Sequence, residues 1–262
     1  MFLNLLKQDE QKKLFMQLAN VMALSDGVVA NDTERTEEGL DHVIPGVAVG
    51  RGLFSLGGLF SDTSESDIWE EIKATSYLET WKTLKQHINE SETFMLELFA
   101  AEMGLFTYTT TNLSDWQELY FINDFGSHLK EALTQVSQAP DAKKKVMLSL
   151  AESDIDLAKV NQKTIETELL KISELRANIF SHISKKFIDD SKLALSFTEK
   201  KAIVFELIGV AYADNEFSEL ELATVKSIAD CLALDAETFN ELTELVAELN
   251  RVSSEALDLI QE

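Results

Sequence analysis

Proline and glycine are scarce in this chain, and their distribution indicates the fold class. There are only 2 Pro and 10 Gly among 262 residues, and nine of the glycines lie at or before Gly126. From Asp141 to Glu262 there is no Pro, and Gly209 is the only Gly. Sheet proteins need turn residues every few positions. The scarcity therefore argues against a sheet in this stretch and predicts an all-α protein built from long helices.

Cysteine is almost absent as well. Cys231 is the only one, which excludes an intramolecular disulfide and a cysteine-based zinc site. It lies in an apolar helical pattern with no basic neighbour in sequence to stabilise a thiolate, so we expect a small buried residue and not a reactive thiol. The N-terminus lacks a basic region followed by an apolar run, so no signal peptide is predicted and a cytoplasmic location is expected.

Positive charge is in short supply. The formal net charge is −23, from 23 basic and 46 acidic residues. Residues 202–262 carry 14 acidic side chains against Lys226 and Arg251 alone. Such a surface repels phosphate backbones, so we expect no nucleic-acid partner. It would attract divalent cations or a protein with a basic surface, although an acidic surface often serves solubility alone.

Familiar catalytic motifs are missing too. The chain has no P-loop, no Gly-x-Gly-x-x-Gly, no His-Glu-x-x-His and no Gly-x-Ser-x-Gly. A carboxylate-bridged metal pair in a helical bundle would need Glu-x-x-His pairs, and none is present. The four histidines are far apart in sequence, and we expect His182 on a helix surface; they are His42, His87, His128 and His182. We therefore predict that the protein is not an enzyme.

The apolar residues that are present recur at helical spacing. A first helix is predicted at about 9–24, and later helices near 199–213, 219–232 and 236–261, the last interrupted around Val252. Gly104 and Gly126 are expected to end two further helices. The tryptophans are expected in the core, and helix starts are predicted at capping residues. The tryptophans are Trp69, Trp81 and Trp116, and the capping residues are Asn31, Ser64, Asn89, Ser114, Thr198 and Ser218.

Beyond Pro140, a predicted boundary, the chain shows a heptad pattern in which nine of twelve positions are apolar. This predicts a long helix packed along a seam, used in an intramolecular hairpin that resembles a coiled coil. Three regions follow from these patterns: an N-terminal region 1–126, a middle region 127–197 and an acidic C-terminal region 198–262. The heptad positions are Leu148, Ile155, Gln162, Leu169, Arg176 and Ile183, with Ala151, Ala158, Ile165, Ile172, Ile179 and Lys186.

One segment, Val43–Phe60, is nearly all apolar or Gly. At 18 residues it is slightly shorter than the roughly 20 that a membrane-spanning helix needs. Arg51 lies at its centre and acidic residues flank it on both sides, which both disfavour insertion. We expect a mobile or surface-packed loop. A partner-binding loop and membrane contact are the two alternatives.

Two segments that lie 188 residues apart align without a gap. Lys12-Lys13 matches Lys200-Lys201, and Ala23–Gly27 matches Ala211–Asn215. Each ends an amphipathic helix with a small residue before an Asp. Each is followed by a short loop and a capping pattern, at Asn31 and at Ser218. We call the two segments, with their capping patterns, the first and second half-motifs.

The half-motifs resemble the TerB-like family, named for a tellurite-resistance protein. Its members are all-helical and show a small residue, Asp and Gly, then a short loop and a Glu at the start of the next helix. The second half-motif, continued by residues 228–234, matches well, although Asn215 replaces the usual Gly. The first matches more loosely, and residues 92–105 are a candidate for the helix that usually follows it. The long middle region has no counterpart in this resemblance.

The resemblance implies a non-enzymatic interaction or scaffold protein in a bacterial stress-response or defence system, with protein partners. Acidic residues of the family are linked to the binding of divalent cations. The resemblance therefore implies a candidate Ca²⁺ site with four ligands: Asp26, Glu34, Asp214 and Glu221. Neither loop has the EF-hand pattern, and an Asp in a helix–helix turn beside a capping Glu needs no metal, so a structural role is expected. The alternatives are a membrane-active helical protein that inserts Val43–Phe60 and an acidic neutraliser of a basic toxin.

Overall fold

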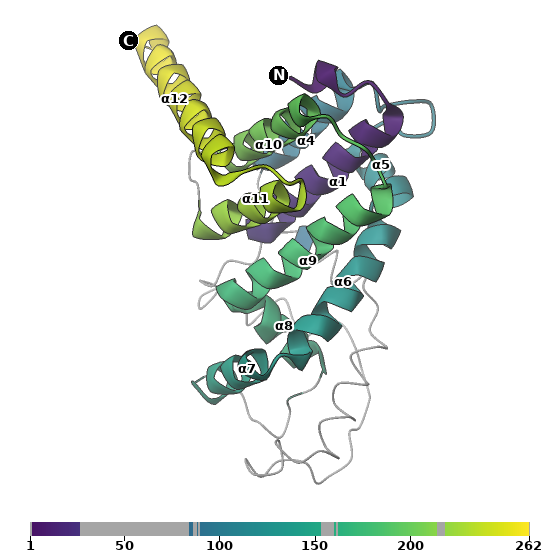
Figure 1. The fold of residues 1–262 in the computed structure, drawn as a ribbon, viewed down its shortest axis with the longest axis vertical. Helices are drawn as coiled ribbons and strands as arrows, with labels where there is room; N and C mark the ends of the chain where they lie inside the picture. Colours follow the sequence, from purple (N-terminus) through teal and green to yellow (C-terminus); the bar gives the residue numbers. More distant parts are fainter. Residues whose placement is uncertain are drawn as a thin grey trace.

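The computed structural model describes residues 2–26, 84–85, 88, 90–152, 160, 162–213 and 218–261. All regular structure in this part of the chain is helical, which confirms the all-α prediction (Figure 1). The segment Val43–Phe60, with the helix starts predicted at Asn31, Ser64 and Asn89, lies outside the described residues. The elements are η1 (Leu3–Leu5), α1 (Asp9–Asp26), α4 (Glu90–Glu102), α5 (Leu113–Tyr120), α6 (Ile122–Gln138), α7 (Pro140–Glu152), α8 (Gln162–Lys171), α9 (Ser173–Ser191), α10 (Phe197–Ala211), α11 (Glu219–Cys231) and α12 (Ala236–Gln261).

Helix α1 lies at the centre of the molecule. Every residue from Leu14 to Ser25 is buried, and the helix packs against α4, α9, α10 and α11 (Figure 1). A helix that is apolar on nearly all sides must be covered on all sides. Its few polar residues find partners inside: Asn20 Oδ1 accepts a hydrogen bond from Gln117 Nε2 at 2.6 Å, which ties α1 to α5. The predicted first helix is thus confirmed and forms the core of the fold.

Helix α9 is the second organising element, because it packs against α1, α6, α8 and α11. The α6–α9 contact is aromatic at one end, where the rings of Phe121 and Phe187 stack with centroids 5.7 Å apart. Trp116, a residue of α5, is buried in the core as predicted. Trp69 and Trp81 lie outside the described residues.

The single long helix predicted beyond Pro140 is not present. Pro140 begins α7, and the chain then forms α8 and α9, separated by Ile172 in an extended conformation with ψ 108°. The heptad register also fails in α7, since Leu148 is 52% exposed and Ala151 is exposed as well. Apolar periodicity cannot distinguish one long helix from successive helices that all turn an apolar face to the same core. Within the chain, α7 packs against α6 and α8.

Two predicted helix starts are shifted. Helix α10 begins at Ser196, whose Oγ accepts from Glu199 N while Glu199 accepts from Ser196 N, and not at Thr198. Helix α5 is capped by Asn112, which accepts from Asp115 N at 3.0 Å, and not by Ser114. In each case the residue that caps the helix stands two residues earlier and ranks at least as high as an N-cap. The capping box predicted at Ser218 is confirmed.

Two predicted interruptions are absent and one helix end is confirmed. Gly126 lies inside α6, where the burial of the neighbouring Phe125 and Leu129 outweighs the cost of about 1 kcal/mol for a helical glycine. Helix α12 continues through Val252, because Arg251 pairs with Glu248 and Glu255 across that point, at 2.5 Å each. Gly104 follows α4 in the left-handed region, φ +68°, as predicted.

The two half-motifs meet in the fold. Helix α1 contacts α10, and each also contacts the next described helix after the other: α4 contacts α10, and α11 contacts α1. Gln11 and Glu199, which are equivalent positions 188 residues apart, are hydrogen-bonded at 2.8 Å. Such reciprocal contacts are what two related helical pairs packed face to face would make. The role proposed for residues 92–105 as the helix that follows α1 fits this arrangement.

Candidate functional site

Glu221, one of the four predicted metal ligands, lies in the first turn of α11. Its side chain is buried, and Oε2 accepts a hydrogen bond from Ser218 N at 2.9 Å. Ser218 Oγ in return accepts from Glu221 N at 3.2 Å. The carboxylate therefore satisfies a backbone amide at the helix start, where the helix dipole also favours negative charge. This geometry is that of a structural cap.

Of the other three predicted ligands, only Asp26 lies among the described residues. Asp26 is the last residue of α1, while Glu34 and Asp214 lie outside the described residues. Elsewhere in the described ranges, no group of three or more His, Cys, Asp or Glu side chains is placed to hold a metal ion. The calcium site stays a prediction, with Glu221 as its one member of known geometry.

Two histidines that are distant in sequence both lie at the α6–α9 contact, each near a carboxylate of the other helix. His128 Nε2 lies 3.5 Å from Asp190 Oδ2, and His182 Nε2 lies 3.9 Å from Glu131 Oε1. His182 is less exposed than was predicted for a helix surface, because its side chain faces α6 and is 18% exposed. A helix position does not reveal which neighbour covers it, since that depends on tertiary packing.

Burial and the charges around these two side chains determine their protonation state. Burial lowers the pKa of both His128 and His182, more than the nearby carboxylates raise it. Lys186 binds Glu131 at 2.6 Å, and this hydrogen bond lowers the pKa of the Glu131 carboxyl. The histidines are therefore held neutral beside an ionised, paired carboxylate. Such a cluster joins two helices and offers no general acid at neutral pH.

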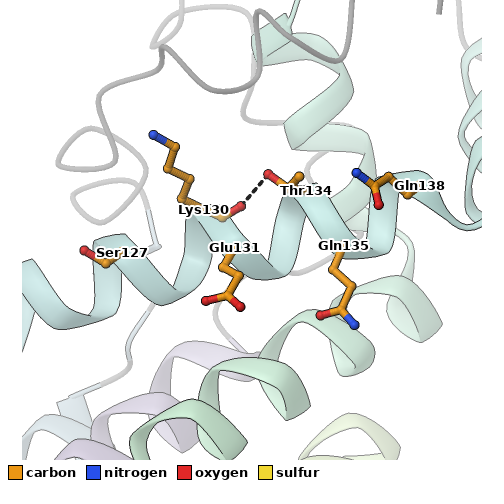
Figure 2. A pocket seen from close by; sticks show the side chains of 6 residues that line it. All are labelled: Ser127, Lys130, Glu131, Thr134, Gln135 and Gln138. Atoms are coloured by element: carbon orange, nitrogen blue, oxygen red, sulfur yellow. Dashed lines mark hydrogen bonds between the residues drawn. The ribbon is translucent and has the colours of Figure 1, made fainter. Parts of the chain in front are cut away.

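A shallow hollow of about 420 Å³ lies along α6 (Figure 2). Figure 2 shows that Glu131 and Gln135 point to one side of the helix and that Lys130 and Thr134 point to the other. The described residues of its lining have polar side chains and all lie on α6: Ser127, Lys130, Glu131, Thr134, Gln135 and Gln138. Ligand sites are usually concave and mostly apolar, with convergent polar groups from several elements. The described part of this lining supplies no such convergence, because its side chains come from one helix.

Cys231, at the end of α11, is half-buried. Burial raises the pKa of its thiol, and the raising outweighs the effect of Lys185 nearby. A raised pKa keeps the sulfur in the thiol form, which is a poor nucleophile. This agrees with the expectation of an unreactive cysteine, although the side chain is less buried than predicted.

Helix α12 has two different apolar faces. One face packs against α10 and carries Phe239 and Val246, which are both buried, with Leu242 partly buried against the core. Beyond Val246 the helix leaves the body, and Figure 1 shows its C-terminal half extending away from the other helices. From Arg251 to Ala256 every residue is exposed, as are Leu259 and Ile260.

The second apolar face of α12 is exposed along its length. It starts at Leu245, 54% exposed, and ends at Ile260, 80% exposed. We call it the outer stripe; its large members are Leu245, Leu249, Val252, Leu259 and Ile260, with Ala256 between them. Exposed apolar rows of this kind mark interaction surfaces on folded proteins. The stripe was not predicted from the sequence, although its alternate spacings of three and four residues are a signal that the sequence contains.

No helix in the described residues is long and apolar enough to cross a membrane. Val43–Phe60, the segment for which membrane contact is an alternative prediction, lies outside those residues.

Comparison with protein families gives one match. The model for tellurite resistance protein TerB matches residues 135–244, from the end of α6 into the first half of α12. No curated protein and no solved structure matches the chain. The match includes the middle region, for which the resemblance had offered no counterpart, and it does not extend to the first half-motif. Residues 135–244 thus form a TerB-family region, and the resemblance seen in the sequence is confirmed.

Proposed function

We propose that this chain is a non-enzymatic interaction or scaffold protein of a bacterial, cytoplasmic stress-response system related to tellurite resistance. The TerB-family region supports the setting. The observation that carries the interaction role is the outer stripe of α12, where five large apolar side chains from Leu245 to Ile260 are each about half exposed or more. A folded protein keeps such a row in water only at a cost in solubility, which a partner would remove.

The experiment is a complementation test in the native host. We expect deletion of the gene to lower growth in tellurite, and the wild-type gene to restore it. The variant Leu249→Gln/Val252→Gln removes two apolar side chains from the outer stripe and should not restore growth. Leu148→Gln is the matched control, because Leu148 on α7 is 52% exposed and Leu249 is 51% exposed. It should complement fully.

The outcomes separate the two parts of the proposal. Equal protein abundance for all variants, checked by immunoblot, excludes an effect of folding. Full complementation by the α12 double variant would show that the outer stripe is not the working surface. A deletion strain that grows like wild type in tellurite would contradict the stress-response setting itself.

A further inference from the structure

The outer stripe of α12 has the residue spacing of a two-helix seam. Its members Leu245, Leu249, Val252, Ala256 and Leu259 follow one another at intervals of 4, 3, 4 and 3 residues. This alternation is the pattern by which one helix packs along another, and the row is narrower than the apolar face by which a helix usually lies on a globular core. It points to a helix as the object that covers the stripe.

The stripe is also placed where a second helix can lie. Successive residues of an α-helix are rotated by about 100° about its axis. The centre of the outer stripe therefore lies roughly a third of a turn away from the face of α12 that packs on α10. A partner helix along the stripe would therefore leave Phe239 and Val246 in their present contacts. From Leu245 to Ile260 the stripe is about 22 Å long at 1.5 Å per residue, which is enough for two heptads.

The charges that flank the stripe are acidic. Glu248 and Glu255 lie directly beside the seam on one edge, both more than half exposed. The other edge carries Ser253 and Ile260, which have no charge. Across residues 236–262, seven acidic side chains face Arg251 as the single basic one, and the last turn of the helix has no basic residue. Negative charge at a helix C-terminus is unfavourable, so a cationic neighbour would stabilise this end.

A second copy of the chain fits these charges poorly. In an antiparallel pair, Glu248 and Glu255 of one copy would face the same residues of the other, and like charges at these positions repel. In a parallel pair they would face Ser253 and Ile260, which gives no attraction. Each copy also has a formal net charge of −23.

From the spacing and the charges together, we infer that the outer stripe of α12 binds a basic amphipathic helix of another protein. The partner inserts apolar side chains between Leu249, Val252 and Leu259, and its Lys or Arg side chains contact Glu248 and Glu255. Arg251, which now bridges those two carboxylates, shares them with the partner. The inference rests on the proposed function only in taking α12 as an interaction surface.

The test uses the full chain and three synthetic peptides of about three heptads each. The first has Leu at the seam positions and Lys at both flanks. The second replaces each Lys by Glu, and the third has the first composition in scrambled order. Binding is measured by fluorescence anisotropy of labelled peptide at two salt concentrations. We expect the first peptide to bind, more weakly at high salt, and at least about tenfold more tightly than either of the others.

Variants show whether the peptide sits on the stripe. Leu249→Gln/Val252→Gln should weaken binding by about tenfold or more, the effect of losing central contacts in a helix interface. Leu148→Gln should bind like wild type. Glu248→Gln/Glu255→Gln should weaken binding and flatten its salt dependence, whereas Glu219→Gln, an exposed glutamate on α11, should change little.

Three results would overturn the inference. One is equal binding of the ordered and scrambled Lys peptides, which would show attraction to the acidic surface in general. Another is undiminished binding to the Leu249→Gln/Val252→Gln variant. The third is dimerisation of the wild-type chain that the same variant abolishes, which would assign the stripe to a second copy. None of these bears on growth in tellurite, so failure here is distinguishable from failure of the proposed function.

Discussion

At the scale of single residues, Glu221 separates a structural from a metal-binding interpretation of the acidic turn. Its buried carboxylate accepts from Ser218 N at the start of α11. We predict that Glu221→Ala lowers the free energy of unfolding by about 0.5–2 kcal/mol, the range for loss of a cap. Glu219→Ala in the same turn, where the side chain is exposed, should stay within about 0.5 kcal/mol of wild type. Urea unfolding measures both.

The calcium prediction concerns the same turn. If capping is the whole role of Glu221, Ca²⁺ and EDTA leave the melting temperature unchanged, and this is the result we expect. A melting temperature that rises with Ca²⁺, following RT ln(1 + [L]/Kd), would indicate a site. That site would be the predicted one only if Asp214→Ala and Glu221→Ala each abolish the rise.

The histidines between α6 and α9 predict how stability depends on pH. Burial lowers the pKa of His128 and His182 below their value of 6.5 in an unfolded chain. Their contribution to stability is therefore present above about pH 6.5 and is lost as the pH falls towards the folded-state pKa, because protonation favours the unfolded chain. We expect the free energy of unfolding to fall less between pH 7 and pH 5 in His128→Gln/His182→Gln than in wild type. A steeper fall in the variant would show that the folded protein holds the histidines as cations on Asp190 and Glu131.

At the scale of helices, two glycines predict opposite effects of one substitution. Gly209 lies within α10, and a Cβ there would meet no atom within 4 Å. Gly209→Ala should raise the free energy of unfolding by about 0.5–1 kcal/mol, since Ala is the better helix former. Gly104 has equal space, but its φ is +68°. Gly104→Ala should therefore destabilise, by about 1 kcal/mol. Denaturant unfolding of the pair tests whether backbone conformation decides the sign.

Helices were predictable from the sequence where local chemistry determines them. The capping box at Ser218 and Glu221, the start of α1 and the glycine after α4 are all short-range features. Where two capping residues compete, as Ser196 and Thr198 do, the sequence does not show which one the tertiary structure selects. Burial was less predictable: Leu148 and Arg176 lie in one heptad row, yet the first is exposed and the second buried.

In the candidate sites too, short-range features were predictable and tertiary contacts were not. The capping role of Glu221 was predicted because it depends on two residues that are three positions apart. The histidine–carboxylate contacts were not, since His128 and Asp190 are 62 residues apart, and Glu131 and His182 are 51 residues apart, and each pair is brought together only by the packing of α6 on α9. The outer stripe of α12 was readable as spacing, but the sequence alone does not show that the body leaves it uncovered.

At the scale of the whole molecule, the TerB-family region is incomplete without α1. Helices α9, α10 and α11 all pack against α1, which lies outside residues 135–244. We predict that a fragment of residues 135–244 exposes this apolar surface, binds a hydrophobic dye and melts without a cooperative transition, whereas the full chain melts cooperatively. A fragment that melts as sharply as the full chain would show that α1 is dispensable to this region.

The central place of α1 also has a consequence during synthesis. In the described part of the chain, four helices pack on α1: α4, α9, α10 and α11. Only α4 is synthesised soon after α1. The other three begin with α9 at Ser173 and end with α11 at Cys231. At about 5–20 residues per second, α1 leaves the ribosome roughly 10–40 s before its last partner. During that interval its apolar sides are open to other chains, and long-range contacts of this kind form slowly. Aggregation of nascent chains, more than equilibrium unfolding, is therefore the expected weakness of this fold when translation slows or ends early.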